Sequence, residues 1–277
     1  MLADASLLTQ RPALGLLLCL PLVVLLAALV MWPLVQLVLQ SVDGGPGAPW
    51  WRAWSDLVSV PRHRRALLTS VGLSAAAAIV STALCLMPAW LLARRLIPGG
   101  AWLRMVLALP MSFSGLIVGF LLIVLIGRAG ALPALTGLGS GLAYTLTGLV
   151  LAYLYFEVPR ATLTLESAIR TLDPQLDVAA RSLGARPWQH ALFVVLPLLG
   201  PALLATLAMT FAVSLGSFGV ALLLSVRGIA LLPLELFMQY MAPPTDRALA
   251  AAMALTLAAI ALGVGVGLRR LVEPRYA

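Results

Sequence analysis

Apolar stretches of membrane-spanning length restrict the fold of this chain more than any other feature. Residues 14–39 carry no charged side chain and are interrupted only by Pro21 and Pro33. A helix needs about 20 apolar residues to cross the roughly 30 Å hydrocarbon layer, so this stretch predicts a transmembrane helix. A cleaved signal peptide is disfavoured, because its apolar region is usually about 7–15 residues long and no A-x-A cleavage site follows here.

The composition extends this conclusion to the whole chain. Of the 277 residues, 62% are hydrophobic and 10% are charged, and the mean hydropathy is +1.04. A soluble domain needs more polar residues to cover its surface. The sequence therefore predicts an all-α polytopic membrane protein.

The hydrophobic pattern predicts about six transmembrane helices. We expect Pro110 and the small residues around it to kink the third and allow tight packing. Gly216, Ser217 and Gly219 predict that the fifth ends or unwinds early. A short surface helix is expected over 231–241. The expected spans are 14–39, 67–93, 103–126, 142–156 (ended by Glu157, Val158 and Pro159), a fifth from about 198 into FAVSLGSFGVALLL, and 248–268.

A polar segment, 172–197, separates the fourth and fifth spans and predicts two short helices joined by a corner. Asp173 can accept a hydrogen bond from the first turn, where Pro174 needs no amide partner. Gly184 follows as the expected left-handed residue past the helix end. Pro187 then opens a second helix that runs toward Pro197.

The spacing in this segment resembles the E-A-A loop of binding-protein-dependent, type I ABC importer permeases. The matching residues are Ala179, Ala180, Gly184, Val194, Leu196 and Pro197. In that family the loop is cytoplasmic and its first helix docks in a groove of the ATP-hydrolysing subunit; the alternative is an ordinary amphipathic cytoplasmic loop. The residues that the resemblance assigns to ATPase coupling are Asp177, Ala179, Ala180, Arg181, Gly184, Ala185, Leu196 and Pro197.

The sequence departs from the family at one position, where Val178 replaces the usual glutamate and Asp177 precedes it. One interpretation is that Asp177 takes over the contact with a cation of the ATPase subunit. The other is that Asp177 only favours the first turn of its helix by its negative charge. A shift of one residue rotates a side chain by roughly 100° around a helix, so both interpretations stay open.

The arginines support a cytoplasmic position for this loop. All 18 cationic side chains are Arg, and eleven fall on the side of the loop against seven on the other, as the positive-inside tendency predicts. Arg62, Arg64 and Arg65 are the exception on the outer side. We expect both termini in the cytoplasm and, from the resemblance, a multi-pass protein of the bacterial inner membrane.

Aromatic and cysteine residues have simpler expected roles. Trp50, Trp51 and Trp54 follow the first span and predict an interfacial anchor, or alternatively a docking surface for a soluble partner. Cys19 and Cys85 lie in apolar runs and are expected to be small buried hydrophobes. Because the arginines are scattered, nucleic-acid binding is disfavoured, and lipid phosphates and partner carboxylates are the expected contacts.

The sequence offers no catalytic or metal constellation. His63 is expected outside and His190 inside, so they cannot share a metal ion or a nucleophile. Ser140 and Ser217 have no histidine within a span to activate them. A chain without Lys cannot contain the G-x-x-x-x-G-K-[ST] phosphate loop. We therefore expect no enzyme activity and no cofactor in this chain, with ATP and Mg²⁺ bound by the partner ATPase subunit.

The resemblance covers about 67–270 and implies one half of a transmembrane pathway. It implies pairing with an identical or sister permease, two ATPase subunits and a periplasmic solute-binding protein; the alternative is a non-transport membrane scaffold or assembly protein. The single domain, 1–277, would comprise the first span and periplasmic loop (1–65), the family core (66–270) and, within it, the coupling loop (160–197).

The stretch FAVSLGSFGVALLL is similar to the subgroup of polyamine, ferric iron, thiamine, sulfate and aminoethylphosphonate importers. From this similarity we expect a polyamine or a related small charged solute. The candidate residues of the translocation path are Ser112, Ser114, Ser214 and Ser217.

Overall fold

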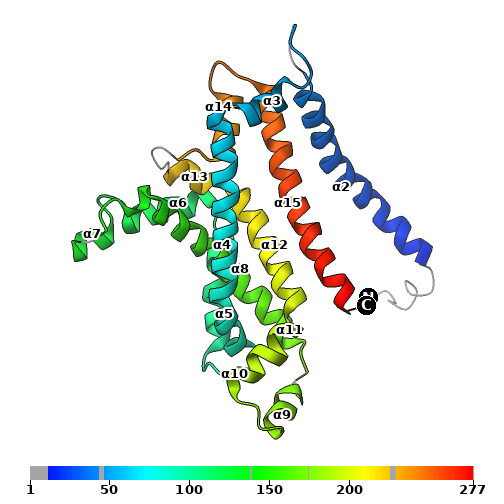
Figure 1. Ribbon diagram of the computed structural model, residues 1–277, viewed down its shortest axis with the longest axis vertical. Helices are drawn as coiled ribbons and strands as arrows, with labels where there is room; N and C mark the ends of the chain where they lie inside the picture. The colour runs from blue at the N-terminus through cyan, green and yellow to red at the C-terminus, as the bar shows by residue number, and fades with distance from the viewer. Residues whose placement is uncertain (1–11, 44–46, 138, 174, 225–228, 277) are drawn as a thin grey trace, which may run out of the picture.

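The computed structural model describes residues 12–43, 47–137, 139–173, 175–224 and 229–276, and within these ranges it contains helices and turns but no strand (Figure 1). The all-α prediction is confirmed. The long helices follow the long axis of the molecule, and short helices lie at both ends and on one side (Figure 1). The long helices are α2 Pro12–Ser41, α4 Pro61–Ala93, α8 Leu146–Arg170, α12 Gly200–Leu215 and α15 Arg247–Tyr276.

Short helices connect the long ones. The predicted surface helix is confirmed as α14, although its Glu235 is buried and accepts a hydrogen bond from Arg62 Nε at 2.8 Å. The short helices outside the polar segment are α3 Arg52–Ser59, α5 Gly100–Ala108, η1 Leu109–Ser112, α6 Gly115–Ile126, α7 Ala131–Thr136, η2 Leu142–Tyr144, α13 Phe218–Leu224 and α14 Leu232–Met241.

By length and composition, fewer segments of the described chain qualify as spans than the six expected. Four segments of the described chain are long and apolar enough to cross a bilayer: Leu20–Ser41, Pro61–Ala93, Gly115–Thr136 and Arg247–Leu271. A fifth results if Ala191–Leu198 and Gly200–Leu215 count as one span bent by 61°. Helix α8, which includes the expected fourth span, is not among these segments; it has 25 residues and carries Glu157, Arg160, Glu166 and Arg170.

The predicted end of the fourth span at 157–159 is wrong, because α8 continues to Arg170 with Pro159 inside it. Helix α8 packs along α4 over most of its length. Leu149 and Leu165, on either side of the proline, are both fully buried. Packing on both sides of the proline outweighs the one lost amide hydrogen bond, which membrane helices tolerate where neighbours pack closely.

Two other spans are broken: the sequence predicts this for the fifth, whereas for the third it predicts only a kink in a continuous helix. The third divides into α5 and α6, because Phe113 and Ser114 are extended between them. The fifth ends at Leu215, and α13 begins at Phe218. The two broken regions touch: a Cβ added at Gly219 would lie 2.7 Å from the backbone nitrogen of Leu116. Glycine is therefore required where these backbones meet.

Two apolar clusters lie along α4 and α8, one toward each end. The first joins α4, α6, α8 and α13 and includes Val118, Leu149 and Val220. The second joins the lower parts of α4 and α8 to the chain before α12 and includes Leu165 and Leu199. Helix α2 lies apart from the bundle and packs on α15 (Figure 1). Most of its described side chains are exposed, so lipid or a partner subunit can contact them.

Candidate coupling loop and polar core

The first helix of the polar segment, α9 (Gln175–Ser182), has the predicted start and end. Asp173 Oδ1 accepts a hydrogen bond from the Gln175 amide at 2.9 Å. Past the helix, the Ala185 amide donates to the Ala180 carbonyl at 3.0 Å, and Gly184 has a φ of +76°. This bond and the left-handed glycine form a Schellman motif, so the predicted glycine corner is confirmed.

The second helix is also confirmed. It comprises α10 (Pro187–His190), a π-helical turn, η3 (Ala191–Val195), and α11 (Leu196–Leu198). The Arg186 amide donates to Gln189 Oε1 at 2.8 Å. A side chain three residues after the cap thus satisfies the amide of the cap residue, as in one half of a capping box.

The two helices of the segment differ in how they are held. The second is anchored: His190 packs edge-on against Trp90 of α4 with ring centroids 6.1 Å apart, and Val195 is buried against the lower cluster. Helix α9 instead projects beyond the bundle (Figure 1), and α10 is the main element that it contacts. Val178 is 68% exposed and Leu183 is 88% exposed. An isolated helix with exposed apolar side chains has the form of a docking element.

The structure places the predicted coupling residues in two groups. Ala179 is exposed and Ala180 buried on α9, while Gly184 and Ala185 form the corner. Leu196 is half-buried and Pro197 exposed in α11. The backbone of α9 includes Asp177 and Arg181, but their side chains, like Pro174, lie outside the part of the chain that is described.

The four candidate path serines lie at the helix breaks. Ser112 and Ser114 are exposed between α5 and α6, and Ser217 is half-buried between α12 and α13. The contact of Gly219 with Leu116 brings these two breaks together. Ser214 differs, because it is 2% exposed and its hydroxyl donates to Glu157 Oε1 at 3.3 Å.

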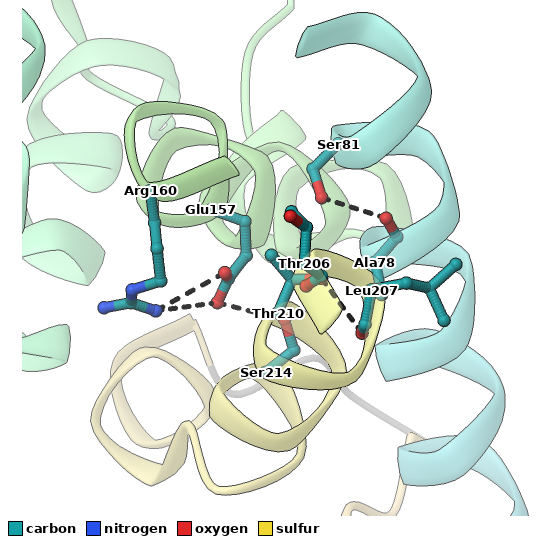
Figure 2. A network of polar contacts seen from close by, with 8 residues as sticks. All are labelled: Ala78, Ser81, Glu157, Arg160, Thr206, Leu207, Thr210 and Ser214. Carbon is teal, nitrogen blue, oxygen red and sulfur yellow. Dashed lines mark hydrogen bonds and ion pairs between the residues drawn. The ribbon is translucent and has the colours of Figure 1, made fainter. Parts of the chain in front are cut away.

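A buried acidic residue, Glu157, forms a polar core that the sequence analysis did not find. Figure 2 shows its carboxylate between Arg160 on α8 and Ser214 on α12. Arg160 Nη1 lies 3.4 Å from both carboxylate oxygens, and its guanidinium lies over the Phe156 ring at 4.8 Å. The signal was present in the sequence, because an arginine three residues after a glutamate lies on the same helix face.

Besides Ser214, three hydroxyl groups near this pair bond to backbone carbonyls of their own helices. Thr206 donates to the Ala202 carbonyl at 2.7 Å, and Thr210 donates to the Thr206 carbonyl at 2.9 Å. Ser81 on α4 likewise donates to a carbonyl of its own helix (Figure 2). Polar side chains thus line the contacts of α4, α8 and α12 inside the bundle, where an unpaired charge would be costly.

Comparison with known proteins identifies the family. Residues 87–277 match the family described as binding-protein-dependent transport system inner membrane component. The molybdenum transport system permease protein ModB of Mycobacterium tuberculosis is 34% identical over 231 residues, which are 81% of this chain and 83% of that protein. The sulfate transport system permease protein CysT of Escherichia coli is 30% identical over 198 residues, or 71% and 70% of the two chains.

A solved structure shows the same fold. A bacterial ABC transporter involved in the import of the acidic polysaccharide alginate matches with a TM-score of 0.77, 16% identity and coverage of 98% of both chains. A second structure is of a bacterial alginate ABC transporter in complex with an alginate-bound periplasmic protein, with a TM-score of 0.73, 15% identity and coverage of 95% of both chains.

Family membership excludes the alternative of a non-transport scaffold. The relatives are permease subunits and not enzymes, and the ATPase is a separate subunit. The partners are ATP-hydrolysing subunits, a second permease subunit and a periplasmic binding protein. This chain belongs to the binding-protein-dependent transport system inner membrane component family and is a multi-pass inner-membrane permease subunit of an ABC importer.

Proposed function

We propose that the solute carried by this permease is a small tetrahedral oxyanion of the molybdate and sulfate class. The observation that carries the proposal is the 34% identity to the molybdenum permease over 81% of this chain. The sulfate permease relative points to the same chemical class. The expected polyamine finds no support among these relatives, whose names refer to molybdenum and sulfate.

The charge of the chain favours an anion over a polyamine. The net charge is +8, and Arg64 and Arg65 are exposed at the start of α4, on the proposed outer side. A positive surface potential raises the local concentration of anions and repels a polycation. The same argument explains why these arginines are tolerated against the positive-inside tendency.

Uptake into proteoliposomes tests the solute class. The complete importer is reconstituted with the binding protein on one side of the membrane and ATP on the opposite side, where the ATPase subunits lie. Labelled molybdate, sulfate or spermidine is then added on the side of the binding protein. We expect ATP-dependent uptake of an oxyanion and none of spermidine. Uptake of spermidine without uptake of either oxyanion would refute the proposal. A complex without ATP is the control for leakage.

We further propose that α9 is the element that docks on the ATPase subunit, which would bind ATP and Mg²⁺. Its isolation from the bundle and the exposure of Val178 and Leu183 support this role. The coupling residues would then act in two ways: Gly184 and Ala185 set the angle of α9, and Leu196 and Pro197 join the second helix to α12. Ser112, Ser114 and Ser217 are proposed to line the path, with Ser214 holding Glu157 beside it.

A further inference from the structure

One buried carboxylate at the base of the bundle is shared by two arginines from different helices. Glu166 on α8 is 3% exposed. Its Oε1 accepts a hydrogen bond from Arg104 Nε of α5 at 2.6 Å. The same oxygen accepts bonds from Arg170 Nε at 3.0 Å and Arg170 Nη2 at 2.7 Å. Charge-assisted bonds of this length are among the stronger polar contacts in proteins.

The two arginines have different structural consequences. Arg170 lies four residues after Glu166 on the same helix, so its bonds join α8 only to itself. Arg104 comes from α5, and its Nη2 also donates to the Leu92 carbonyl in the last turn of α4 at 3.1 Å. The planar guanidinium makes both bonds at once because its donors form a rigid fork. Arg104 therefore connects α5 to the ends of α4 and α8.

The position of this connection gives it a mechanical consequence. Helix α8 ends at Arg170, and α9 starts at Gln175, so Glu166 lies near the point where the docking helix joins the bundle. On the other side, α5 leads through η1 and two extended residues to α6, whose Leu116 meets Gly219 in the first turn of α13. A displacement of the end of α8 thus reaches α5 through the bond between Glu166 and Arg104.

We propose that Glu166 and Arg104 are positioning residues that transmit movement of the coupling loop to the α5–α6 segment beside the transport path. The inference rests on the proposed docking role of α9 and is independent of the solute. A bond between two helices carries a displacement from one to the other, whereas a bond within one helix does not. Arg170 is therefore a matched control, since it contacts the same carboxylate oxygen.

The test compares Arg104→Gln with Arg170→Gln in the full importer in nanodiscs. The measured quantity is the ratio of ATP hydrolysis with solute-loaded binding protein to hydrolysis without it. We expect Arg104→Gln to lower this ratio about fivefold or more, in the range of typical coupling between sites. Arg170→Gln should change it by less than about twofold, because Glu166 keeps its bond to Arg104 and only an i,i+4 pair within one helix is lost. Thermal unfolding of each complex shows whether the fold is retained.

Two further variants separate a coupling role of Glu166 and Arg104 from a purely structural one and test the docking of α9. Exchange of the charges, Arg104→Glu with Glu166→Arg, is made together with Arg170→Gln, because Arg170 would otherwise repel a second arginine on the same helix face. It should restore part of the ratio that each single change removes. Equal ratios for Arg104→Gln and Arg170→Gln, or no recovery in the exchanged variant, would overturn the proposal and leave Glu166 a structural residue. The Val178→Cys variant tests the docking role of α9 separately from the Arg104 proposal. A thiol-reactive cross-linker joins this cysteine to the ATPase subunit only if α9 docks there.

Discussion

Two residues with left-handed backbones end helices on the same side of the bundle. Gly184 has a φ of +76°, and Arg95, after α4, has a φ of +56°. Arg95 carries a Cβ in this conformation, which costs roughly 1–2 kcal/mol. The fold thus contains a strained corner at Arg95, whereas at Gly184 the absence of a Cβ removes this cost from the coupling loop.

We expect Gly184→Val to reduce transport without preventing insertion. Nothing lies within 4 Å of a Cβ added at this position, so the cost is conformational and not steric. A strain of about 1–2 kcal/mol shifts the equilibrium between loop conformations about 5–30-fold. Solute uptake and ATP hydrolysis of the reconstituted complex should both fall at normal expression.

Gly184→Asn is the control, because asparagine adopts the left-handed region more readily than valine. It should retain more uptake than the valine variant. Unchanged uptake in Gly184→Val would show that the corner does not set the position of α9.

At the scale of single residues, the sequence predicts those contacts whose interacting groups are neighbours along the chain. The cap formed by Asp173 and the corner at Gly184 depend on amides within a few residues. The buried Glu157 and Glu166 could not be assigned, because Ser214 and Arg104 reach them from other helices. Local spacing reveals a partner on the same helix face, but it contains no information on which helices become neighbours.

Among the elements, the contact between α6 and α13 depends most closely on small residues. Gly119 also faces α13, and a Cβ there would lie 3.2 Å from the Leu223 Cβ. A Cβ at Gly219 would lie 2.7 Å from the Leu116 nitrogen and 3.0 Å from the Gly115 carbonyl carbon. Since both obstacles at Gly219 are backbone atoms, a substituted side chain can be accommodated only by separating the two segments.

Gly219→Ala should consequently destabilise the permease by about 1–3 kcal/mol, the usual cost of overpacking. Gly263→Ala in α15 is the matched control, because nothing lies within 4 Å of its added Cβ. Replacing a helix-interior glycine by alanine in open space stabilises by roughly 0.5–1 kcal/mol. Thermal unfolding of the solubilised complex should show opposite shifts for the two variants. A decrease for both, or for neither, would contradict the close contact.

Prolines show why element boundaries were only partly predictable. Pro110 is expected to kink the third span, and the span breaks there instead; Pro159 is expected to end the fourth span, and it lies inside α8. The two prolines differ in their surroundings: Pro159 is buried between well-packed turns, whereas the residues after Pro110 are mostly exposed. For these two prolines the difference lies in the tertiary packing, which the sequence alone does not provide.

At the scale of the whole molecule, the two ends of the bundle have different characters. One end carries α3 and α14, held by ion pairs of Arg52 with Asp246 and Arg62 with Glu235. The opposite end carries α9 and α10 (Figure 1). The start of α2 and the end of α15 lie toward the α9 end (Figure 1). The proposed orientation therefore places α9 in the cytoplasm, and α3 and α14 outside.

Single cysteines test this orientation, in a variant in which Cys19 and Cys85 are replaced by alanine. Trp51 is 53% exposed and Leu183 is 88% exposed, so a cysteine at either position is accessible from its own side of the membrane. Pro243, between α14 and α15, is also exposed.

A membrane-impermeant maleimide should label Trp51→Cys and Pro243→Cys in intact spheroplasts. It should label Leu183→Cys only after the membrane is opened. Labelling at 183 in intact spheroplasts, with protection at 51 and 243, would reverse the orientation. The docking role of α9 would then be untenable, because an ATPase subunit in the cytoplasm could not reach it.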